Sequence, residues 1–183
     1  MSGANPYQPC FLIPCYNHGS TIAAVVDSLA SFSVPILVVD DGSEEATKQT
    51  LDALANEEKI TLIRLTENQG KGGAVMAGIQ QAYADGFSHA IQIDADGQHD
   101  LDALPNLLQA SQDKPDNLIS GQPIYDDSVP KSRLYGRYAT HIWVWIETLS
   151  LSIKDSMCGF RAYPLEATAN VLNKNEIGKR MDF

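Results

Sequence analysis

Two aspartates one residue apart follow a short apolar run in the stretch "IQIDADGQHD", residues 91–100. In an extended or tightly turning segment alternate residues share a face, so the side chains of Asp94 and Asp96 point the same way. Carboxylates placed like this repel each other unless a cation lies between or near them. A hard divalent ion such as Mg²⁺ or Mn²⁺ accepts one or two carboxylates and takes its other ligands from water and a substrate's phosphates. The spacing therefore favours a metal site that holds a diphosphate.

Two other interpretations of this pair compete with a metal site. A helix–loop–helix calcium loop needs Gly at its sixth position and Glu at its twelfth. Counted from Asp94, Gly97 is the fourth residue and Pro105 the twelfth, which excludes such a loop. Aspartate also caps helices and forms turns readily, so on this pair alone capping explains the pattern as well as a metal does.

The elements that position the two aspartates follow from four short apolar runs that alternate with segments of helical periodicity. We predict strands over residues 10–14, 35–39, 60–65 and 90–93, and helices over residues 22–32, 44–57 and 73–84. This alternation is typical of an α/β sandwich. The strands are almost continuously apolar, as in parallel sheets that are covered on both faces. Further along, a helix from Leu101, a strand over 117–121 and a longer helix over 135–152 are predicted.

Polar residues follow three of these predicted strands where each one ends. The first strand leads into the stretch 14–17, the second into 40–43 and the fourth into 94–96. Because ligands of parallel sheets bind beyond the carboxyl ends of the strands, these groups are expected to converge on one site. Asp41 can accept hydrogen bonds from a nucleobase edge or ribose hydroxyls, although Asp-Gly is also an ordinary turn signal.

The stretch "NQGKGG", residues 68–73, precedes a predicted helix. Its glycines can expose backbone N–H groups, and Lys71 can meet an anion at the helix N-terminus. The stretch is neither a P-loop nor a G-x-G-x-x-G motif, because the required spacings are absent. The simpler interpretation is a glycine-rich loop that ends in a surface lysine.

A basic cluster of Lys131, Arg133 and Arg137 precedes an apolar segment with Trp143 and Trp145. Arg133 and Arg137 lie one turn apart if the segment is helical, which suits a phosphate, although a solvated helix start explains them equally. A helix that is apolar nearly all round is buried, docked on a partner or resting on a membrane, with burial the interpretation that we favour.

The composition and net charge argue against several classes of function. The 183 residues are 44% hydrophobic and carry a formal charge of -10, which argues against nucleic acid as a partner because a basic stripe is absent. Three cysteines with no ligand spacing indicate neither a disulfide framework nor a zinc site. No leader or membrane-spanning run is evident, so we expect a cytoplasmic protein.

Five motifs occur together and in order: "IPCYNHGSTI", "ILVVDDGS", "NQGKGGAVMAGI", "IQIDADGQHD" and "DSMCGFRAYP". In this combination the chain resembles the family 2 glycosyltransferases, nearest the dolichol-phosphate mannosyltransferase-like branch. The resemblance implies a GT-A fold, which is a Rossmann-like αβα sandwich with a mostly parallel central sheet. We expect residues 1–183 to form a single catalytic domain that lacks its C-terminal end, because family members continue past "RMDF".

The resemblance also assigns site residues. It places the nucleotide-sugar at Pro14, Tyr16, Asn17, Asp40, Asp41, Lys71, Asp94, Ala95 and Asp96. The divalent metal, Mg²⁺ or Mn²⁺, would be held by Asp94, Asp96 and Gln98. The acceptor or its phosphate would meet Arg133, Arg137, Gly159, Phe160 and Arg161, and the catalytic carboxylates would be Asp94, Asp96 and Asp155.

The reaction that the resemblance implies is an inverting, metal-dependent transfer from a UDP- or GDP-sugar to a lipid-phosphate or other cell-envelope acceptor. A lipid phosphate needs no protein base, whereas a hydroxyl acceptor needs a carboxylate such as Asp155 to take its proton. Peripheral contact with the inner face of the cytoplasmic membrane would follow. Two alternatives remain: a sugar nucleotidyltransferase, and a degenerate GT-A binding module.

Overall fold

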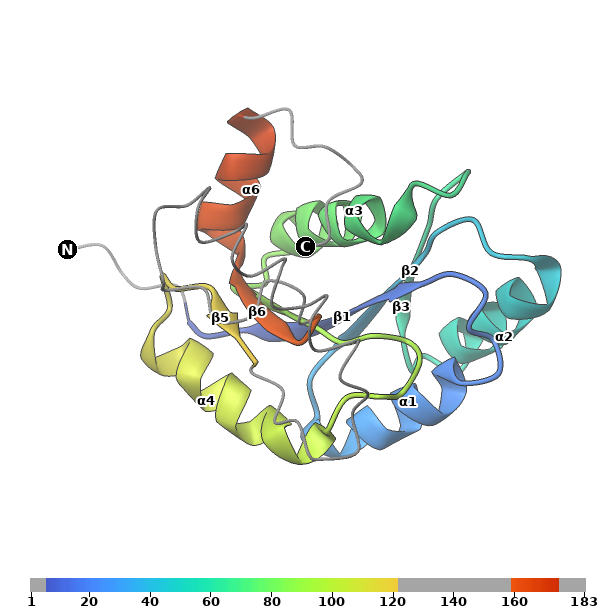
Figure 1. The fold of residues 1–183 in the computed structure, drawn as a ribbon, viewed down its shortest axis with the longest axis horizontal. Coiled ribbons are helices and arrows are strands. Elements are labelled where there is room, and N and C mark those ends of the chain that lie inside the picture. Colours follow the sequence, from blue (N-terminus) through green and yellow to red (C-terminus); the bar gives the residue numbers. More distant parts are fainter. Residues whose placement is uncertain (1–5, 122–158, 175–183) are drawn as a thin grey trace, which may run out of the picture.

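The computed structural model describes residues 6–121 and 159–174, which form a six-stranded sheet with helices on both faces (Figure 1). The strands lie in the order β3-β2-β1-β4-β6-β5. Their bounds are β1 Pro9–Cys15, β2 Ile36–Asp40, β3 Thr61–Arg64, β4 His89–Gln92, β5 Ile119–Ser120 and β6 Arg161–Pro164.

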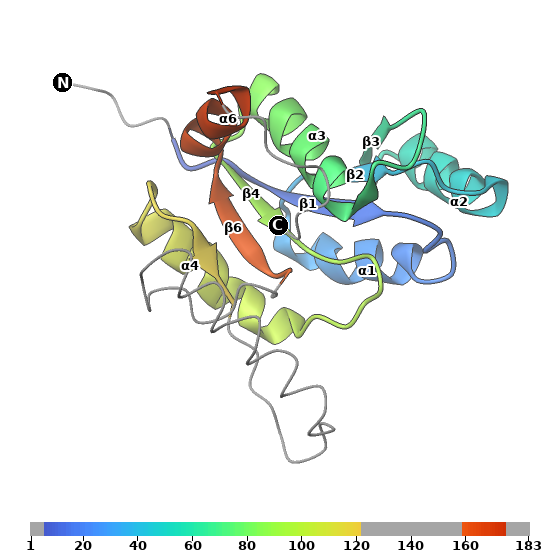
Figure 2. The same ribbon diagram turned by 45° about the horizontal axis from the view of Figure 1, so that its top comes forward.

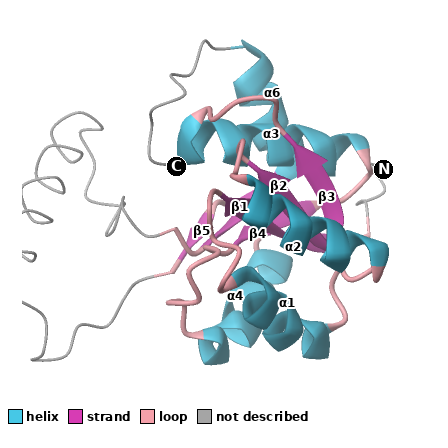
Figure 3. Ribbon diagram, turned by 90° about the vertical axis from the view of Figure 1, so that its right-hand side faces the viewer, coloured by secondary structure: helices cyan, strands magenta, loops and turns pink. Residues whose placement is uncertain are grey.

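The helices form the two outer layers, which Figure 3 shows edge on. The α helices are α1 Ile22–Leu29, α2 Glu45–Asn56, α3 Gly70–Ala84, α4 Leu104–Asp113 and α6 Leu165–Lys174, and the short 3-10 turns are η1 Ala30–Phe32 and η2 Leu101–Ala103. Helices α3 and α6 cover one face of the sheet, while α1 and α4 cover the other, as Figure 2 shows.

The order of the strands in the sheet determines where a ligand site can form. Strands β1 to β4 pair in parallel, whereas β6 runs antiparallel to β4, and β5 runs antiparallel to β6. From β1 the chain passes to β2 on one side, and it crosses back from β3 to place β4 on the other side of β1. In open α/β sheets such a switch in direction leaves a crevice beyond the carboxyl ends of the two central strands. Here those strands are β1 and β4.

Two apolar clusters, one on each face, hold the layers together. Along β1 the side chains alternate, so that Phe11 and Ile13 pack on the α1 side while Cys10 and Leu12 pack on the α3 side. All four are completely buried. The continuous apolar runs therefore do reflect a sheet that is covered on both faces. The two edge strands, β3 and β5, are the exceptions, because their residues are exposed or half-buried.

The four predicted parallel strands are confirmed to within one or two residues. Helix α3 begins at Gly70 rather than at residue 73, so the stretch expected to be a loop forms the first helical turn. Strand β6 and helix α6 were not predicted. The helix predicted over 135–152 lies outside the described residues. Within residues 6–121 and 159–174, no helix has the length and apolar character needed to cross a membrane.

Gly78 allows α3 to pack closely against the sheet. A Cβ at this position would overlap the Leu12 side chain and lie 3.0 Å from Val39 Cγ2, both of which are fully buried. Alanine is the better helix former, but overpacking a filled core costs about 1–3 kcal/mol and outweighs that gain. We expect Gly78→Ala to lower the midpoint of thermal unfolding by several degrees in calorimetry. The exposed neighbour Gln80→Ala should leave it almost unchanged.

Candidate functional site

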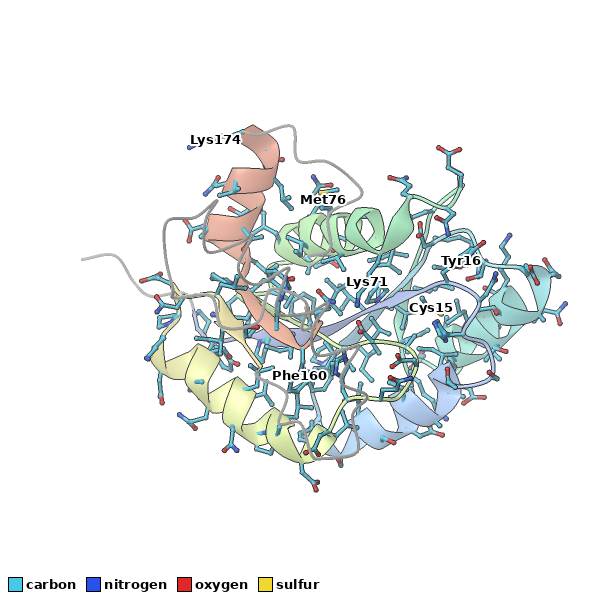
Figure 4. All side chains as sticks on the ribbon, in the orientation of Figure 1. Cys15, Tyr16, Lys71, Met76, Phe160 and Lys174 are labelled. Atoms are coloured by element: carbon cyan, nitrogen blue, oxygen red, sulfur yellow. The ribbon has the colours of Figure 1, made fainter. Side chains whose placement is uncertain are left out.

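A cavity of about 310 Å³ lies beyond the carboxyl ends of β1 and β4. The residues that line it come from the ends of β1, β2 and β4 and from the start of α3. They are Pro14, Cys15, Tyr16, His18, Asp41, Asn68, Gly70, Lys71, Ala74, Asp94, Ala95 and Asp96. Figure 4 labels three of them, Cys15, Tyr16 and Lys71, between the end of β1 and the start of α3. The structure thus brings together most of the residues predicted to bind a nucleotide-sugar.

The segment that carries Asp94 and Asp96 is a loop fixed to the first helix. The carbonyl oxygen of Ala95 accepts a hydrogen bond of 2.7 Å from the Thr21 hydroxyl, just before α1. The two carboxylates line the main cavity and also a second cavity of about 260 Å³ on the α1 side of the loop. Their side chains therefore face open space from a loop that a hydrogen bond joins to Thr21.

The turn interpretation of these aspartates holds in part. Asp96 Oδ1 accepts a hydrogen bond of 3.0 Å from the backbone N–H of Gln98, which is a local turn. The helix cap is provided by a later residue, because Asp100 Oδ1 accepts from the N–H of Asp102 at the start of η2. Among the described residues, Asp94 accepts no backbone N–H of its own loop, and side chains are its neighbours instead. Turn formation and a cavity-facing position therefore coexist at Asp96, whereas Asp94 faces the cavity without capping a helix.

Two ionisable side chains lie against the Asp94 carboxylate. Lys71 Nζ lies 2.8 Å from its carboxylate, and His99 Nε2 lies 3.4 Å from Oδ2. Burial by itself would raise the pKa of the Asp94 carboxyl, but the neighbouring His99 and Lys71 side chains outweigh it and hold the pKa well below its usual range. Asp94 is therefore an anion at neutral pH, ready to accept a cation.

Gly159 closes the other side of Asp94. A Cβ on Gly159 would lie 2.7 and 2.9 Å from the two Asp94 carboxylate oxygens and 2.9 Å from Lys71 Nζ. No side chain fits there without moving the ion pair. The next residue, Phe160, stacks on the His99 ring with centroids 5.2 Å apart. The segment expected to meet the acceptor thus packs directly against the loop expected to hold the metal.

Asp41 joins the end of β2 to the start of α3. Its Oδ1 accepts a hydrogen bond of 2.7 Å from the backbone N–H of Gln69, and its side chain is almost wholly buried. Burial raises the pKa of the Asp41 carboxyl, and the N–H groups of Gln69 and Gly70, which lower it, do not offset this fully. Asp41 nevertheless lines the cavity, where it can accept a hydrogen bond from a bound ligand.

Asp40 and Asn17, which were also predicted to contact the nucleotide, are not among the residues that line the cavity. Asp40 is completely buried, and its carboxylate accepts bonds of 2.9 Å from both the N–H of Ser43 and Arg64 Nε. Asn17 Oδ1 accepts a bond of 2.7 Å from the N–H of Glu44, where α2 begins. Through these hydrogen bonds both side chains shape the loops after β1 and β2.

Three further predicted residues lie apart from the cavity lining. Gln98 is exposed and lies two residues after Asp96 in the same loop. Arg161 is buried in β6, with 8% of its surface exposed, and contacts the Tyr163 hydroxyl at 3.5 Å. Phe160 is also buried, under the His99 ring. The remaining predicted site residues, Arg133, Arg137 and Asp155, lie outside the described residues.

Several residues near the site were assigned no function from the sequence. His18 lines the cavity, and His99 lies against Asp94 with its buried Nε2 lacking a hydrogen-bond partner among the described residues. Behind Asp94, Gln92 is fully buried and accepts a hydrogen bond of 3.1 Å from the Tyr163 hydroxyl. His99 belongs to the same sequence motif as the two aspartates, but its spacing from the other histidines matches no metal-binding pattern, so the sequence did not predict a role for it.

The residues around Asp94 suit a divalent cation of the Mg²⁺ or Mn²⁺ type. In the part of the chain that the structure describes, no three His, Cys, Asp or Glu side chains are grouped as a protein-only cage. Mg²⁺ does not need such a cage, because it keeps waters and substrate phosphates as ligands. Asp94 and Asp96 share the cavity, and the ammonium group of Lys71 already holds a positive charge against Asp94. Hard oxygen ligands and a position that attracts positive charge therefore fit this class of ion.

Comparison with known proteins is consistent with this geometry. The family model for glycosyl transferase family 2 matches residues 10–167. Polyprenol monophosphomannose synthase of Mycolicibacterium smegmatis is 30% identical over 167 residues, which are 87% of this chain and 63% of that protein. Undecaprenyl-phosphate mannosyltransferase of Micrococcus luteus is 31% identical over 159 residues, which are 83% of this chain and 64% of that protein. The chain thus spans a little under two thirds of these two relatives.

Solved structures show the same fold at low sequence identity. A mannosyltransferase from Pyrobaculum calidifontis, solved with GDP-Man and Mn²⁺, superposes with a TM-score of 0.60 at 17% identity, covering 90% of this chain and 46% of that one. S. aureus TarS, solved with UDP, gives a TM-score of 0.61 at 18% identity, covering 90% of this chain and 48% of that one. The mostly parallel αβα sandwich is thus the GT-A fold. The chain belongs to glycosyl transferase family 2 and resembles its dolichol-phosphate mannosyltransferase-like branch.

Proposed function

We propose that this protein transfers a sugar from a UDP- or GDP-sugar to a polyprenyl or dolichyl phosphate, with inversion at the anomeric carbon and with a divalent metal. The observation that supports this most strongly is the shared cavity of Asp41, Lys71, Asp94 and Asp96 at the carboxyl ends of β1, β2 and β4. It places an acceptor for nucleoside hydrogen bonds, a cation and two metal-binding carboxylates around a space large enough for part of a nucleotide.

Asp94 and Asp96 would hold the metal, with Gln98 close enough in sequence to join them. When bound, Mg²⁺ or Mn²⁺ supplies Lewis-acid chemistry that neutralises the charge developing on the departing diphosphate. The relative from Pyrobaculum calidifontis was solved with GDP-Man and Mn²⁺, which supports a divalent ion in this fold. The pKa of Asp94, held low by its neighbours, keeps this ligand ionised at neutral pH.

In the proposed reaction an oxygen of the acceptor phosphate forms a bond to C1 of the donor sugar while the bond from C1 to the diphosphate oxygen breaks. The electron pair leaves with the nucleoside diphosphate. Lys71 and the N-terminal turn of α3, which starts at Gly70, present positive charge and N–H groups to that diphosphate. The protein contributes mainly by positioning and by electrostatic stabilisation.

No enzyme nucleophile is needed for a single displacement, and Cys15, the thiol that the described residues contribute to the cavity, is poorly suited to act as one. Burial raises the pKa of the Cys15 thiol to about 11, so it stays protonated at neutral pH. A lipid phosphate is already ionised and needs no base. If the acceptor were a hydroxyl, Asp155 would be the proposed base.

The acceptor class is supported by the names of two relatives, a polyprenol monophosphomannose synthase and an undecaprenyl-phosphate mannosyltransferase. A lipid acceptor would place the protein at the cytoplasmic face of a membrane. Arg133 and Arg137, which the resemblance places near the acceptor, would then contact its phosphate.

The rival enzyme class, a sugar nucleotidyltransferase, would usually show a glycine-rich basic loop after the first strand. Here the stretch that follows β1, residues 17–20, contains no Arg or Lys. A degenerate binding module is disfavoured because Asp41, Asp94 and Asp96 are all retained and face one cavity.

The test is a transfer assay with the full-length gene product, UDP- and GDP-linked sugars, Mn²⁺ and short-chain polyprenyl phosphate. We expect transfer of one sugar to the lipid phosphate, loss of transfer with EDTA, and recovery with Mn²⁺ or Mg²⁺. Product stereochemistry read by NMR should show inversion. Release of pyrophosphate from a sugar phosphate and a nucleoside triphosphate would instead identify a nucleotidyltransferase. Neither reaction with any donor would support a non-catalytic module.

A further inference from the structure

We infer that Lys71 takes the place of a metal cation: in the ligand-free protein its ammonium group pairs with Asp94, and it would move to the diphosphate once a divalent metal is bound. The inference rests on the proposed function and adds an order of events to it. Lys71 is thereby given two successive partners, first a carboxylate of the protein and then the phosphates of the donor.

The geometry places Lys71 where a metal would need to be. Its Nζ lies 2.8 Å from the Asp94 carboxylate, in contact with the oxygens that a cation would use. Asp94 and Lys71 both line the main cavity. An ammonium group and a divalent ion cannot both take the same face of one carboxylate, since like charges at that separation repel strongly.

Gly159 and His99 lie close against the ion pair of Asp94 and Lys71. The backbone of Gly159 lies so close that an added Cβ would be 2.7 Å and 2.9 Å from the two carboxylate oxygens. On the Oδ2 side, the His99 ring lies 3.4 Å away and is fixed by its stack on Phe160. A cation that approaches Asp94 from the main cavity therefore competes with Lys71 for the carboxylate.

Lys71 can be displaced because its pairing with Asp94 is only partly buried. Its side chain is 43% exposed, and that of Asp94 is 24% exposed. Ion pairs between groups that still contact water contribute little net stability, since solvent screens them and side-chain entropy opposes them. A divalent ion with twice the charge competes well for such a carboxylate.

Lys71 also lies in an unusual place for a lysine, at the second residue of α3. The N-terminus of a helix carries partial positive charge, which disfavours a cation there and favours an anion. After displacement from Asp94, Lys71 remains at this helix end beside the cavity. A diphosphate bound there would meet both the helix terminus and the freed ammonium group.

The inference predicts two effects of opposite sign for one substitution. Lys71→Met keeps most of the side-chain length and removes the charge. Mn²⁺ should then bind the nucleotide-free protein about tenfold more tightly, because its competitor at Asp94 is gone. With saturating Mn²⁺, UDP or GDP should bind about tenfold more weakly, because the diphosphate has lost a cationic partner.

A matched control separates this from a general charge effect. Lys59→Met removes the same charge from a surface ion pair with Asp27 and Glu57, whose residues line neither cavity that contains Asp94. It should change neither affinity. Mn²⁺ binding is read by electron paramagnetic resonance of free Mn²⁺, and nucleotide binding by calorimetry, so turnover is not required. Circular dichroism checks that both variants are folded.

The possible outcomes distinguish the inference from the function on which it rests. If Mn²⁺ binds the wild type and Lys71→Met binds it equally or more weakly, the inferred role of Lys71 is overturned while the metal-dependent function stands. If neither protein binds Mn²⁺ with or without nucleotide, both are overturned. Tighter Mn²⁺ binding together with weaker nucleotide binding in Lys71→Met alone supports the inference.

Discussion

Replacement of Asp94 by asparagine is expected to reduce Mn²⁺-dependent binding of the donor nucleotide about 100-fold or more and to abolish measurable sugar transfer. The amide has nearly the shape of the carboxylate but neither its charge nor its second anionic oxygen. It would lose the ion pair with Lys71, which now lies at 2.8 Å, and could not neutralise a divalent cation. Calorimetric titration of UDP and GDP with and without Mn²⁺ measures the effect.

The matched control for this substitution is Asp102→Asn. Asp102 is exposed, follows the same loop and lines neither cavity, while only its backbone N–H takes part in the cap at Asp100. It should bind nucleotide and Mn²⁺ like the wild type. An Asp94→Asn protein that binds both as tightly as the wild type would remove Asp94 from the metal site.

Gly159→Ala is expected to impair the site strongly while leaving the fold almost as stable. The new Cβ would lie within 2.9 Å of both Asp94 oxygens and of Lys71 Nζ. These are the ends of partly exposed side chains, so they can move aside at little cost in unfolding free energy. Their displacement is costly for function, because a shift of about 1 Å in a catalytic group can lower the rate about 100-fold.

The measurement for Gly159→Ala is a pair of values, the unfolding midpoint and the rate of sugar transfer. We expect a change of at most a few degrees in the midpoint and a loss of about 100-fold in the rate. Gly78→Ala should show the reverse pattern, with a lower midpoint and normal transfer by the folded fraction, because Gly78 lies in the core between α3 and the sheet. Normal transfer by Gly159→Ala would mean that the close approach to Asp94 has no catalytic importance.

The parallel part of the fold was predictable because each strand from β1 to β4 includes a short apolar run bounded by polar residues. In β1, β2 and β4, burial on both faces removes the alternation that an exposed sheet would show. Strand β6 escaped prediction for a physical reason. Its residues Arg161 and Tyr163 are polar, and they are buried beside Gln92, whose Oε1 accepts a hydrogen bond from the Tyr163 hydroxyl. A strand stabilised in this way carries no apolar run.

The first turn of α3 could not be predicted from the sequence for a different reason. Three glycines occupy its first four residues, and glycine is a poor helix former by about 1 kcal/mol. The tertiary structure overrides this preference, because the Asp41 carboxylate accepts the backbone N–H of Gln69 just before the helix. That contact joins residues 28 positions apart, which local propensity does not register.

The candidate site was predictable at the level of motifs but not at the level of single side chains. Asp40 and Asp41 are adjacent, so they point to opposite sides, and the sequence does not say which one faces the ligand. The register decides it: Asp40 lies opposite Arg64 of β3 and pairs with it, which leaves Asp41 at the cavity. The contact of His99 with Asp94 likewise depends on the fold, since Phe160 of a distant segment fixes the ring.

The most direct test of the central claim is a crystal structure of the protein with Mn²⁺ and a UDP- or GDP-sugar, with data collected at the manganese absorption edge. We expect an anomalous peak at about 2.2 Å from carboxylate oxygens of Asp94 and Asp96, with the diphosphate between that peak and the start of α3. Lys71 Nζ should have left Asp94 for a phosphate oxygen. A nucleotide bound elsewhere, or manganese absent from Asp94 and Asp96 with nucleotide in the cavity, would contradict the account.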